Sequence, residues 1–319
     1  MTIKLISYPL ITALVGLLQA NYSPASGNAI PRIAEAQSNV QADVQVETIA
    51  EYPSGTFLEN LTVTKSGDVV FTSYFDKQIL RLSSDGPIEV FAELSDHPIS
   101  ILEIENGFIV TVQATSFLEV PAFTETNAIV MLDSNGSVTS RTAAPQAKFL
   151  NGLHRLPSGE VLAADSMAAT LWQVDPESGE LSSWLSDPLL APDPAMEIFL
   201  PGANGIKSDT ETLYVSNSSR GAIYRLDLTA PNELELFAQT GAVDDFTIDP
   251  EGAIFATTHG EQLLKISPDG EVSVVLSSGC GGCTSIDFWP DEQSLIVIND
   301  GNFYEGGSEP ARVFRVTDF

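Results

Sequence analysis

The chain has 319 residues, and its 43 acidic and 14 basic side chains give it a formal net charge of −29 at pH 7. Such a surface repels nucleic acid and anionic membranes and favours divalent cations, although solubility alone is a common reason for acidity. We therefore expect no nucleic-acid partner and look for a small-molecule substrate.

The first 20 residues have the features of a secretory signal. Lys4 precedes a short apolar run at 5–18, and small and polar residues follow. The run is too short, and too interrupted by Pro9, for a comfortable membrane span; an uncleaved anchor or a disordered tail is the alternative. Residues 21–43 are rich in Ala, Ser, Asn and Gln without periodicity, as in a disordered linker. We expect an exported protein, periplasmic or secreted, with no stable membrane insertion after processing.

One pattern recurs six times along the remaining chain. It consists of a polar residue, apolar residues two and four positions later, a turn with Gly or Pro, and a β-branched run. The six polar residues are Glu59, Ser100, Asn151, Asn204, Asp244 and Thr284. They lie 41, 51, 53, 40 and 40 residues apart, and a period of about 40 to 50 residues with several short strands indicates a propeller. The sequence predicts an all-β fold, a six-bladed β-propeller with four-stranded blades, as one domain at 44–319.

The two ends of this domain carry complementary strand patterns. Residues 44–50 alternate like a strand before the first full unit, and the last unit ends at 312–316 with no strand after it. We expect the N-terminal strand to complete the final blade, so that the ring closes and no sheet edge is left unpaired.

The six polar residues begin the inner strands, so we expect them to ring the central channel at one mouth. Three insertions, at 113–127, 186–203 and 299–310, fall at the same mouth. They could roof a pocket with apolar groups, or merely pack on one another. The residues that we expect to line a substrate pocket there are Ser100, Thr284, His259, Tyr74, Phe199 and Tyr304. His259 could bind substrate or act as an acid or base, but a solvated loop histidine is the simpler alternative.

Four of the ring positions carry a carboxylate or amide carbonyl oxygen. Glu59 and Asp244 supply carboxylates, and Asn151 and Asn204 supply amides. Two carboxylates and two amides on one axis make a hard, oxygen-only cage that suits Ca²⁺ and could accept Mg²⁺ or Mn²⁺. The alternative is that these side chains hydrogen-bond water and backbone in a wet channel. The pattern predicts a site for one divalent cation.

The succession Glu59, Asn151-Gly152, Asn204-Gly205-Ile206 and Asp244 resembles the SMP-30/gluconolactonase-like six-bladed propellers. The resemblance implies that Glu59, Asn204 and Asp244 hold one divalent metal, with Asn151 beside it. It further implies hydrolysis of a lactone or other ester, with the metal as Lewis acid and Asp244 as ligand and proton-handling catalytic residue. Asp245 departs from the family, which often has glycine there, and adjacent strand residues usually point to opposite sides. We therefore expect Asp245 to be structural.

A second resemblance competes with the first. The words Leu58-Glu59-Asn60-Leu61 and Phe149-Leu150-Asn151-Gly152-Leu153 look closer to exported propellers of natural-product pathways, some of which guide cycloadditions. That resemblance implies a pocket protein that folds a biosynthetic intermediate for cyclisation. A non-catalytic binding or scaffold propeller is a third possibility, because fold does not fix function. In each case we expect a monomer.

Both cysteines lie in the Gly-rich stretch Gly279-Cys280-Gly281-Gly282-Cys283. In an exported protein, this spacing is most simply a small local disulfide. No activating cation or helix start is evident for a redox role, and two cysteines without a matching pair are weak evidence for zinc. We expect a Cys280–Cys283 disulfide.

Overall fold

The structure is a computed structural model that describes residues 44–83, 86–119, 126–196, 200–230, 233–291, 293–303, 306–307 and 309–319. The expected signal at 1–20, the expected linker at 21–43 and two expected pocket residues, Phe199 and Tyr304, lie outside the described residues. Within the described part of the chain, no helix is long and apolar enough to cross a membrane.

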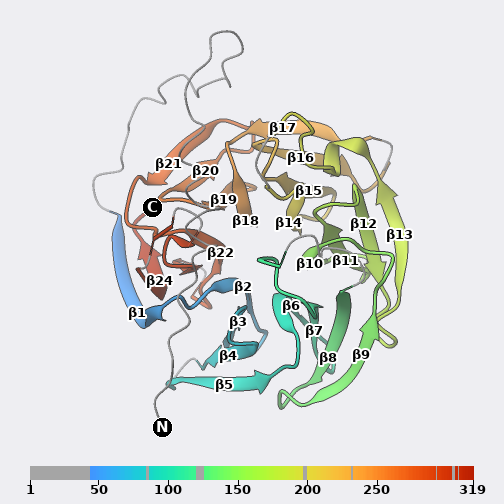
Figure 1. The fold of residues 1–319 in the computed structure, drawn as a ribbon. Helices are drawn as coiled ribbons and strands as arrows, with labels where there is room; N and C mark the ends of the chain where they lie inside the picture. The colour runs from blue at the N-terminus through green and yellow to red at the C-terminus, as the bar shows by residue number, and fades with distance from the viewer. Residues whose placement is uncertain are drawn as a thin grey trace.

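The described residues form six four-stranded antiparallel sheets around a central axis (Figure 1). Blade 1 contains β2 (Leu58–Val63), β3 (Val69–Ser73), β4 (Gln78–Leu82) and β5 (Ile88–Glu93). Blade 2 contains β6 (His97–Ile104), β7 (Gly107–Gln113), β8 (Asn127–Asp133) and β9 (Val138–Ala143). Blade 3 contains β10 (Leu150–Arg155), β11 (Val161–Asp165), β12 (Thr170–Val174) and β13 (Leu181–Ser186).

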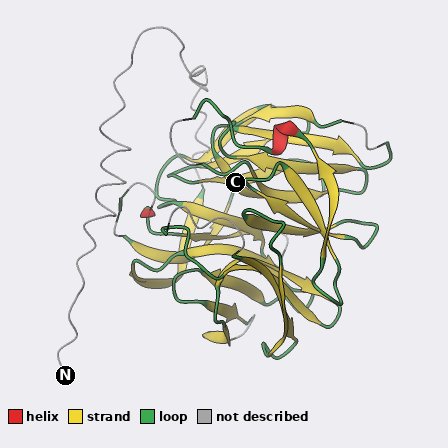
Figure 2. Cartoon of the chain, turned by 45° about the vertical axis from the view of Figure 1, so that its right-hand side comes forward, coloured by secondary structure: helices red, strands yellow, loops and turns green. Residues whose placement is uncertain are grey.

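The remaining blades follow the same plan. Blade 4 contains β14 (Ala203–Ser208), β15 (Thr212–Asn217), β16 (Ala222–Asp227) and β17 (Glu235–Gln239). Blade 5 contains β18 (Val243–Ile248), β19 (Ile254–Thr258), β20 (Leu263–Ile266) and β21 (Val272–Leu276). Strands dominate the cartoon, and a short 3-10 helix, η1 (Pro188–Leu190), lies between blades 3 and 4 (Figure 2). The predicted six-bladed β-propeller is confirmed.

The sixth blade combines the two ends of the described chain. It contains β22 (Cys283–Phe288), β23 (Leu295–Asn299) and β24 (Pro310–Thr317), with β1 (Gln45–Ser54) as its outermost strand. β1 pairs antiparallel with β24, from Gln45 opposite Thr317 to Ser54 opposite Pro310, and the two strands lie side by side in Figure 1. The predicted closure by the N-terminal strand is confirmed, and it ties both ends of the ring together.

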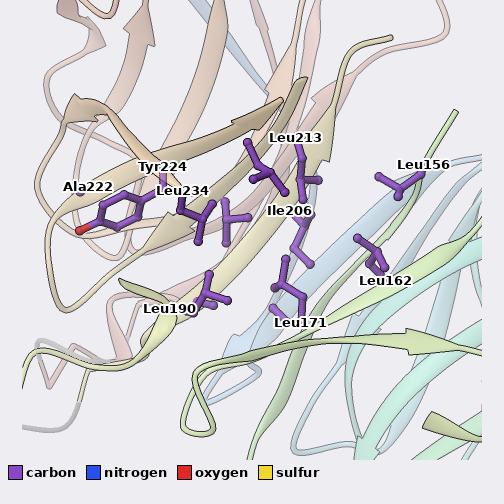
Figure 3. Packing of buried hydrophobic residues seen from close by; sticks show 13 residues of the cluster. Leu156, Leu162, Leu171, Leu190, Ile206, Leu213, Ala222, Tyr224 and Leu234 are labelled. Atoms are coloured by element: carbon purple, nitrogen blue, oxygen red, sulfur yellow. The ribbon is translucent and has the colours of Figure 1, made fainter. Parts of the chain in front are cut away.

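Apolar side chains fill the spaces between neighbouring blades. Between blades 3 and 4, Leu162 and Leu171 face Ile206 and Leu213, and Leu190 of η1 covers one side (Figure 3). All five of these side chains are fully buried. Strands in the middle of a blade, such as β3 and β11, are therefore buried along their whole length, because a neighbouring blade covers each face, whereas an outer strand such as β9 is mostly exposed.

Every inner strand has a register shift where its polar residue stands. On β2 the shift lies between Leu58 and Leu61, so Glu59 and Asn60 together oppose the single residue Thr72 of β3. The corresponding shifts lie at Pro98/Ile101, Leu150/Leu153, Ala203/Ile206, Val243/Phe246 and Cys283/Ser285. A β-bulge re-aims side chains out of the alternation of a regular strand. Two successive residues of each inner strand can therefore reach the channel.

A hydroxyl on the second strand fixes the bulge in four blades of the described chain. In blade 1, Thr72 Oγ1 accepts a hydrogen bond from the Asn60 amide at 3.0 Å and donates one to the Ile99 carbonyl of blade 2, also at 3.0 Å. The same pair of bonds is made by Thr111, Ser216 and Thr257. Each hydroxyl thus satisfies a backbone group left unpaired by the bulge and connects its blade to the next.

A disulfide joins Cys280 to Cys283 just before and at the start of β22. Both cysteines are fully buried, and Asn299 Nδ2 donates a hydrogen bond to the Cys280 carbonyl at 2.7 Å. The Glu261 carboxylate accepts hydrogen bonds from the amides of Gly279 and Gly281. The disulfide therefore stabilises a loop that the surrounding side chains also hold.

Replacing both cysteines with alanine should lower the free energy of unfolding by about 2 kcal/mol, because a short cross-linked loop removes a correspondingly small chain entropy from the unfolded state. Urea unfolding followed by tryptophan fluorescence measures the change. Wild-type protein unfolded with a reductant is the control and should lose the same amount. Equal stability of the oxidised wild type and the double variant would contradict this prediction.

Candidate functional site

The bulges divide the beginnings of the inner strands into two rings of residues. We call the residues that come first the mouth ring: Glu59, Ile99, Asn151, Asn204, Asp244 and Thr284. We call the residues that follow them the deep ring: Asn60, Ser100, Gly152, Gly205, Asp245 and Ser285. The sequence pattern placed Ser100 at the mouth, but the structure places it in the deep ring. The reason is that Ile99 and Ser100 share one bulge, and the apolar residue of the two comes first.

A narrow pocket lies at the mouth ring. Its polar lining consists of Glu59, Asn151, Asn204 and His259. Its apolar lining consists of Tyr74, Ile99, Phe117, Phe149 and Pro201. The free space in the pocket, counted as the volume that the centre of a water molecule can occupy, is only about 10 Å³. That is room for about one water molecule or ion. The pocket thus joins a small polar floor to an apolar side.

Asp244 stands at the centre of the polar contacts. Asn204 Nδ2 donates a hydrogen bond to Asp244 Oδ1 at 2.6 Å and another to Ser218 Oγ at 3.1 Å. The other carboxylate oxygen, Asp244 Oδ2, lies 3.2 Å from His259 Nδ1. His259 directly follows β19, and that strand is paired with the strand that carries Asp244. The fold therefore holds a carboxylate between an amide and an imidazole.

Burial and the repulsion between carboxylates shift the pKa values of the ionisable side chains at the mouth. Burial first, and then the charges of Asp300 and Asp245, raise the pKa of Glu59 to about 8. Burial and then the charge of Glu59 raise the pKa of Asp244 well above its usual value. Burial lowers the pKa of His259 to about 4, so its ring favours the neutral form. Negative charge at the mouth is therefore costly unless a cation is close by.

Asp300 is a site residue that the sequence pattern missed. It directly follows β23, is almost fully buried, and is close enough to raise the pKa of both Glu59 and Asp244. Its Oδ1 accepts a hydrogen bond from the Phe303 amide at 3.1 Å. The available signal was its position: it is the second residue of the third insertion and directly follows a strand that ends at the mouth.

The donor set of the mouth ring fits a hard divalent cation. Asp244 is buried and Glu59 is partly buried, the two carboxylates repel each other, and Asp244 Oδ2 accepts no hydrogen bond from the described residues. Asn151 and Asn204 add amide oxygens to the same pocket. Among the described residues, no three His, Cys, Asp or Glu side chains form a metal-binding group by themselves. A cation here would therefore need the two amides as ligands, which is a common arrangement for Ca²⁺.

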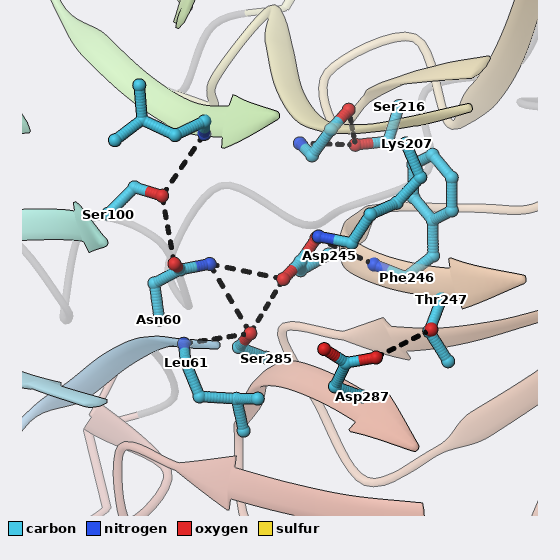
Figure 4. A network of polar contacts seen from close by, with 12 residues as sticks. Asn60, Leu61, Ser100, Lys207, Ser216, Asp245, Phe246, Thr247, Ser285 and Asp287 are labelled. Atoms are coloured by element: carbon cyan, nitrogen blue, oxygen red, sulfur yellow. Dashed lines mark hydrogen bonds and ion pairs between the residues drawn. The ribbon is translucent and has the colours of Figure 1, made fainter. Parts of the chain in front are cut away.

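The deep ring is a network of satisfied polar groups (Figure 4). Asp245 Oδ2 accepts hydrogen bonds from Asn60 Nδ2 at 3.1 Å and Ser285 Oγ at 2.6 Å, and its Oδ1 pairs with Lys207 Nζ at 3.2 Å. Ser100 Oγ donates to Asn60 Oδ1 at 2.8 Å. The network thus joins five blades, 1, 2, 4, 5 and 6, across the axis beneath the pocket. Asp245 has the structural contacts that we expected of it.

Of the other residues that we expected in the pocket, two line it and one makes a contact between blades instead. Tyr74 lines the pocket together with His259. Thr284 belongs to the mouth ring, but its hydroxyl donates to the Leu58 carbonyl of blade 1 at 2.7 Å. In this structure Thr284 therefore connects blades 6 and 1, across the point where the ring closes.

Comparisons with known proteins agree with this architecture. The model of the SMP-30/Gluconolactonase/LRE-like region matches residues 59–299. A luciferin-regenerating enzyme structure is similar, with a TM-score of 0.64 and 19% identity over 87% of this chain and 96% of that one. A gluconolactonase from Xanthomonas campestris has a TM-score of 0.64 and 15% identity over 86% and 90%.

A third similar structure is regucalcin from Agrobacterium tumefaciens, described as a calcium-binding protein. Its TM-score is 0.59, with 17% identity over 84% of this chain and 93% of that one. A search of the curated proteins found no match. At these identities, each structural likeness shows the fold alone.

Proposed function

The chain belongs to the SMP-30/gluconolactonase/LRE-like family, and we propose that it is a hydrolase that opens a lactone or another ester at the channel mouth with the help of one divalent cation. The observation that carries this proposal is that Glu59, Asn151 and Asn204 line one narrow pocket, with Asp244 joined to Asn204 by a hydrogen bond beside it. The gluconolactonase and calcium-binding neighbours share the fold, and they support the class of reaction and the choice of Ca²⁺. Mg²⁺ or Mn²⁺ would suit the same oxygen donors.

Glu59, Asn151, Asn204 and Asp244 would hold the cation, which would supply Lewis acidity that polarises the ester carbonyl. The side chains of the pocket orient the catalytic carboxylate and exclude water. Asn204 fixes the orientation of the Asp244 carboxylate through its 2.6 Å hydrogen bond. The apolar lining limits the water in the pocket, which strengthens electrostatic interactions there.

Asp244 is the catalytic base of this proposal. Water attacks the carbonyl carbon, Asp244 takes the proton that this water loses, and the bond between the acyl carbon and the ester oxygen breaks. The proton then passes to the departing alkoxide, so that acid and alcohol are the products. His259 Nδ1, 3.2 Å from Asp244 Oδ2, is placed to share the proton during this transfer.

Three expectations from the sequence extend this proposal. Export through residues 1–20, the monomeric state and the absence of nucleic-acid partners stay predictions. Guided cyclisation of a biosynthetic intermediate is the rival function, and the apolar side of the pocket is the observation that favours it. The two functions differ in their need for a cation and for water as a reactant.

The proposal is tested by removing and restoring the cation. We expect chelator-treated protein to lose turnover of a panel of lactones and aryl esters, and Ca²⁺ to restore it. At a Ca²⁺ concentration 100 times Kd, thermal and urea unfolding should show about 2.7 kcal/mol of added stability. Glu59→Gln should lose most of this gain because it removes one anionic ligand.

Glu271→Gln, an exposed substitution in a turn, is the matched control and should keep the full metal-dependent gain. Turnover that survives chelation would exclude the cation from the reaction and favour the rival function. An equal metal-dependent shift in wild type and Glu59→Gln would exclude Glu59 as a ligand.

A further inference from the structure

A continuous group of apolar side chains covers one side of the mouth pocket. We call it the aromatic wall: Phe57, Tyr74, Phe75, Ile99, Phe117, Phe149, Met167 and Phe303. Phe57 is fully buried at its centre, with its ring centroid 5.4 Å from that of Phe303 and 5.7 Å from that of Phe117. Tyr74 and Phe117 are closer still, at 4.7 Å. Tyr74, Ile99, Phe117 and Phe149 reach the pocket itself, beside Glu59.

The aromatic wall offers almost no hydrogen bonds to a ligand. Tyr74 is the one member with a hydroxyl group, and that group is already engaged. It donates to Gln113 Oε1 at 3.2 Å and accepts from the Phe117 amide at 2.8 Å. The Met167 sulfur is at best a weak acceptor. A hydroxyl-rich ligand placed against this wall would lose its bonds to water without replacement, and each unpaired hydroxyl would weaken binding by roughly ten- to a hundredfold.

We infer that the substrate carries an apolar alkyl or aryl group next to its ester, and that this group packs on the aromatic wall while the ester faces Glu59 and Asp244. This inference rests on the proposed hydrolase function and names its substrate class. A polyhydroxylated sugar lactone is then a poor substrate.

The side chains of the aromatic wall differ in how easily an alkyl group of the substrate can displace them. The pocket is nearly filled, so an alkyl group must displace side chains. Phe57 and Tyr74 are buried and flank β2 and β3, whereas Phe117 and Phe303 are partly exposed and belong to the loops after β7 and β23. Phe117, which lines the pocket, and Phe303, which packs against Phe57 and Phe117, are therefore the residues that govern how much room the substrate finds.

A series of γ-lactones with growing alkyl chains tests the inference on the metal-loaded, full-length protein. From γ-butyrolactone to γ-decalactone, kcat/KM should rise by about two- to fourfold for each added methylene, as expected for burial of CH₂ groups. Glucono-δ-lactone should be hydrolysed more slowly than γ-decalactone. Phe117→Ala and, independently, Phe303→Ala should flatten the dependence on chain length.

Phe237→Ala on the outer strand β17 is the matched control, and it should keep the dependence. Because the two alanine variants lie in different loops, the test still holds if one of them fails to fold. A flat series, or faster hydrolysis of glucono-δ-lactone, would overturn the inference and leave the hydrolase intact. A chain-length dependence that both variants keep would likewise overturn the role of the wall.

Alkyl γ-lactams provide a readout without turnover. Isothermal titration calorimetry should show Kd falling with chain length in wild type and much less in Phe117→Ala. If no lactone or aryl ester is hydrolysed but the lactams bind in this way, the proposed function fails and the apolar ligand class stands. If neither hydrolysis nor this binding series is observed, both are wrong.

Discussion

Replacing Asp244 with asparagine should reduce kcat/KM for lactone hydrolysis by about 10²- to 10⁴-fold, the contribution typical of a general base. The variant keeps the volume of the side chain and can still contact Asn204 and His259. It loses the negative charge and the ability to take a proton. The fold should be retained, because the deep ring beneath is untouched and the buried carboxylate is itself destabilised by its neighbours.

Asp249→Asn is the matched control, since Asp249 directly follows the same inner strand, β18, at its opposite end. Its carboxylate accepts a hydrogen bond from the Ala253 amide at 2.7 Å, which an asparagine oxygen can also accept. Steady-state kinetics on one lactone, with circular dichroism of both variants, makes the comparison. A folded Asp244→Asn protein with turnover within threefold of wild type would remove Asp244 from the mechanism.

Replacing Asp245 with alanine should lower the free energy of unfolding by about 3–5 kcal/mol, the usual loss when one partner of a buried ion pair is removed. The loss has several sources. Lys207 would keep a charge that is 21% exposed, and Asn60 and Ser285 would lose their common acceptor. Urea unfolding measures the effect, and it should be the same with a chelator present because Asp245 is outside the proposed ligand set.

Asp133→Ala, at the last residue of β8, is the control for the substitution itself: it removes an acceptor of two backbone hydrogen bonds from the following turn without breaking an ion pair, and should cost clearly less than Asp245→Ala. Asp245→Asn should fall between the two because it keeps hydrogen-bonding capacity without the charge. A loss of under 1 kcal/mol in Asp245→Ala would show that the deep ring does not hold the blades together.

The repeat was enough to predict the propeller, the number of blades and the closing strand. Inter-blade packing requires each unit to bury both faces, so a polar residue followed by apolar strands recurs at a nearly fixed spacing. The same repeat brought Glu59, Asn151, Asn204 and Asp244 to one mouth, because equivalent residues of successive blades lie around one axis.

The repeat could not reveal how the rings are layered. A bulge makes two neighbouring residues both face the channel, so the polar member is not always the one at the mouth, as Ile99 and Ser100 show. Asp300 escaped notice because it stands at the end of a second strand, outside the repeated pattern. The aromatic wall was foreseen in part, because Phe117 and Phe303 lie in two of the insertions that we expected to bring apolar groups over the pocket. Phe57 was missed, since it precedes the first polar residue of the repeat and has no equivalent that the spacing could align.

The pairing of β1 with β24 also has a consequence for the newly made chain. β1 ends at Ser54 and β24 begins at Pro310, so at about 5–20 residues per second a ribosome makes the two strands roughly 10 to 50 s apart. During that interval β24 has not been made and β1 is unpaired, and an unpaired strand edge can pair with other chains. Its exposed Glu47 and Glu51 place charge along this strand, which protects the emerging chain until the ring can close.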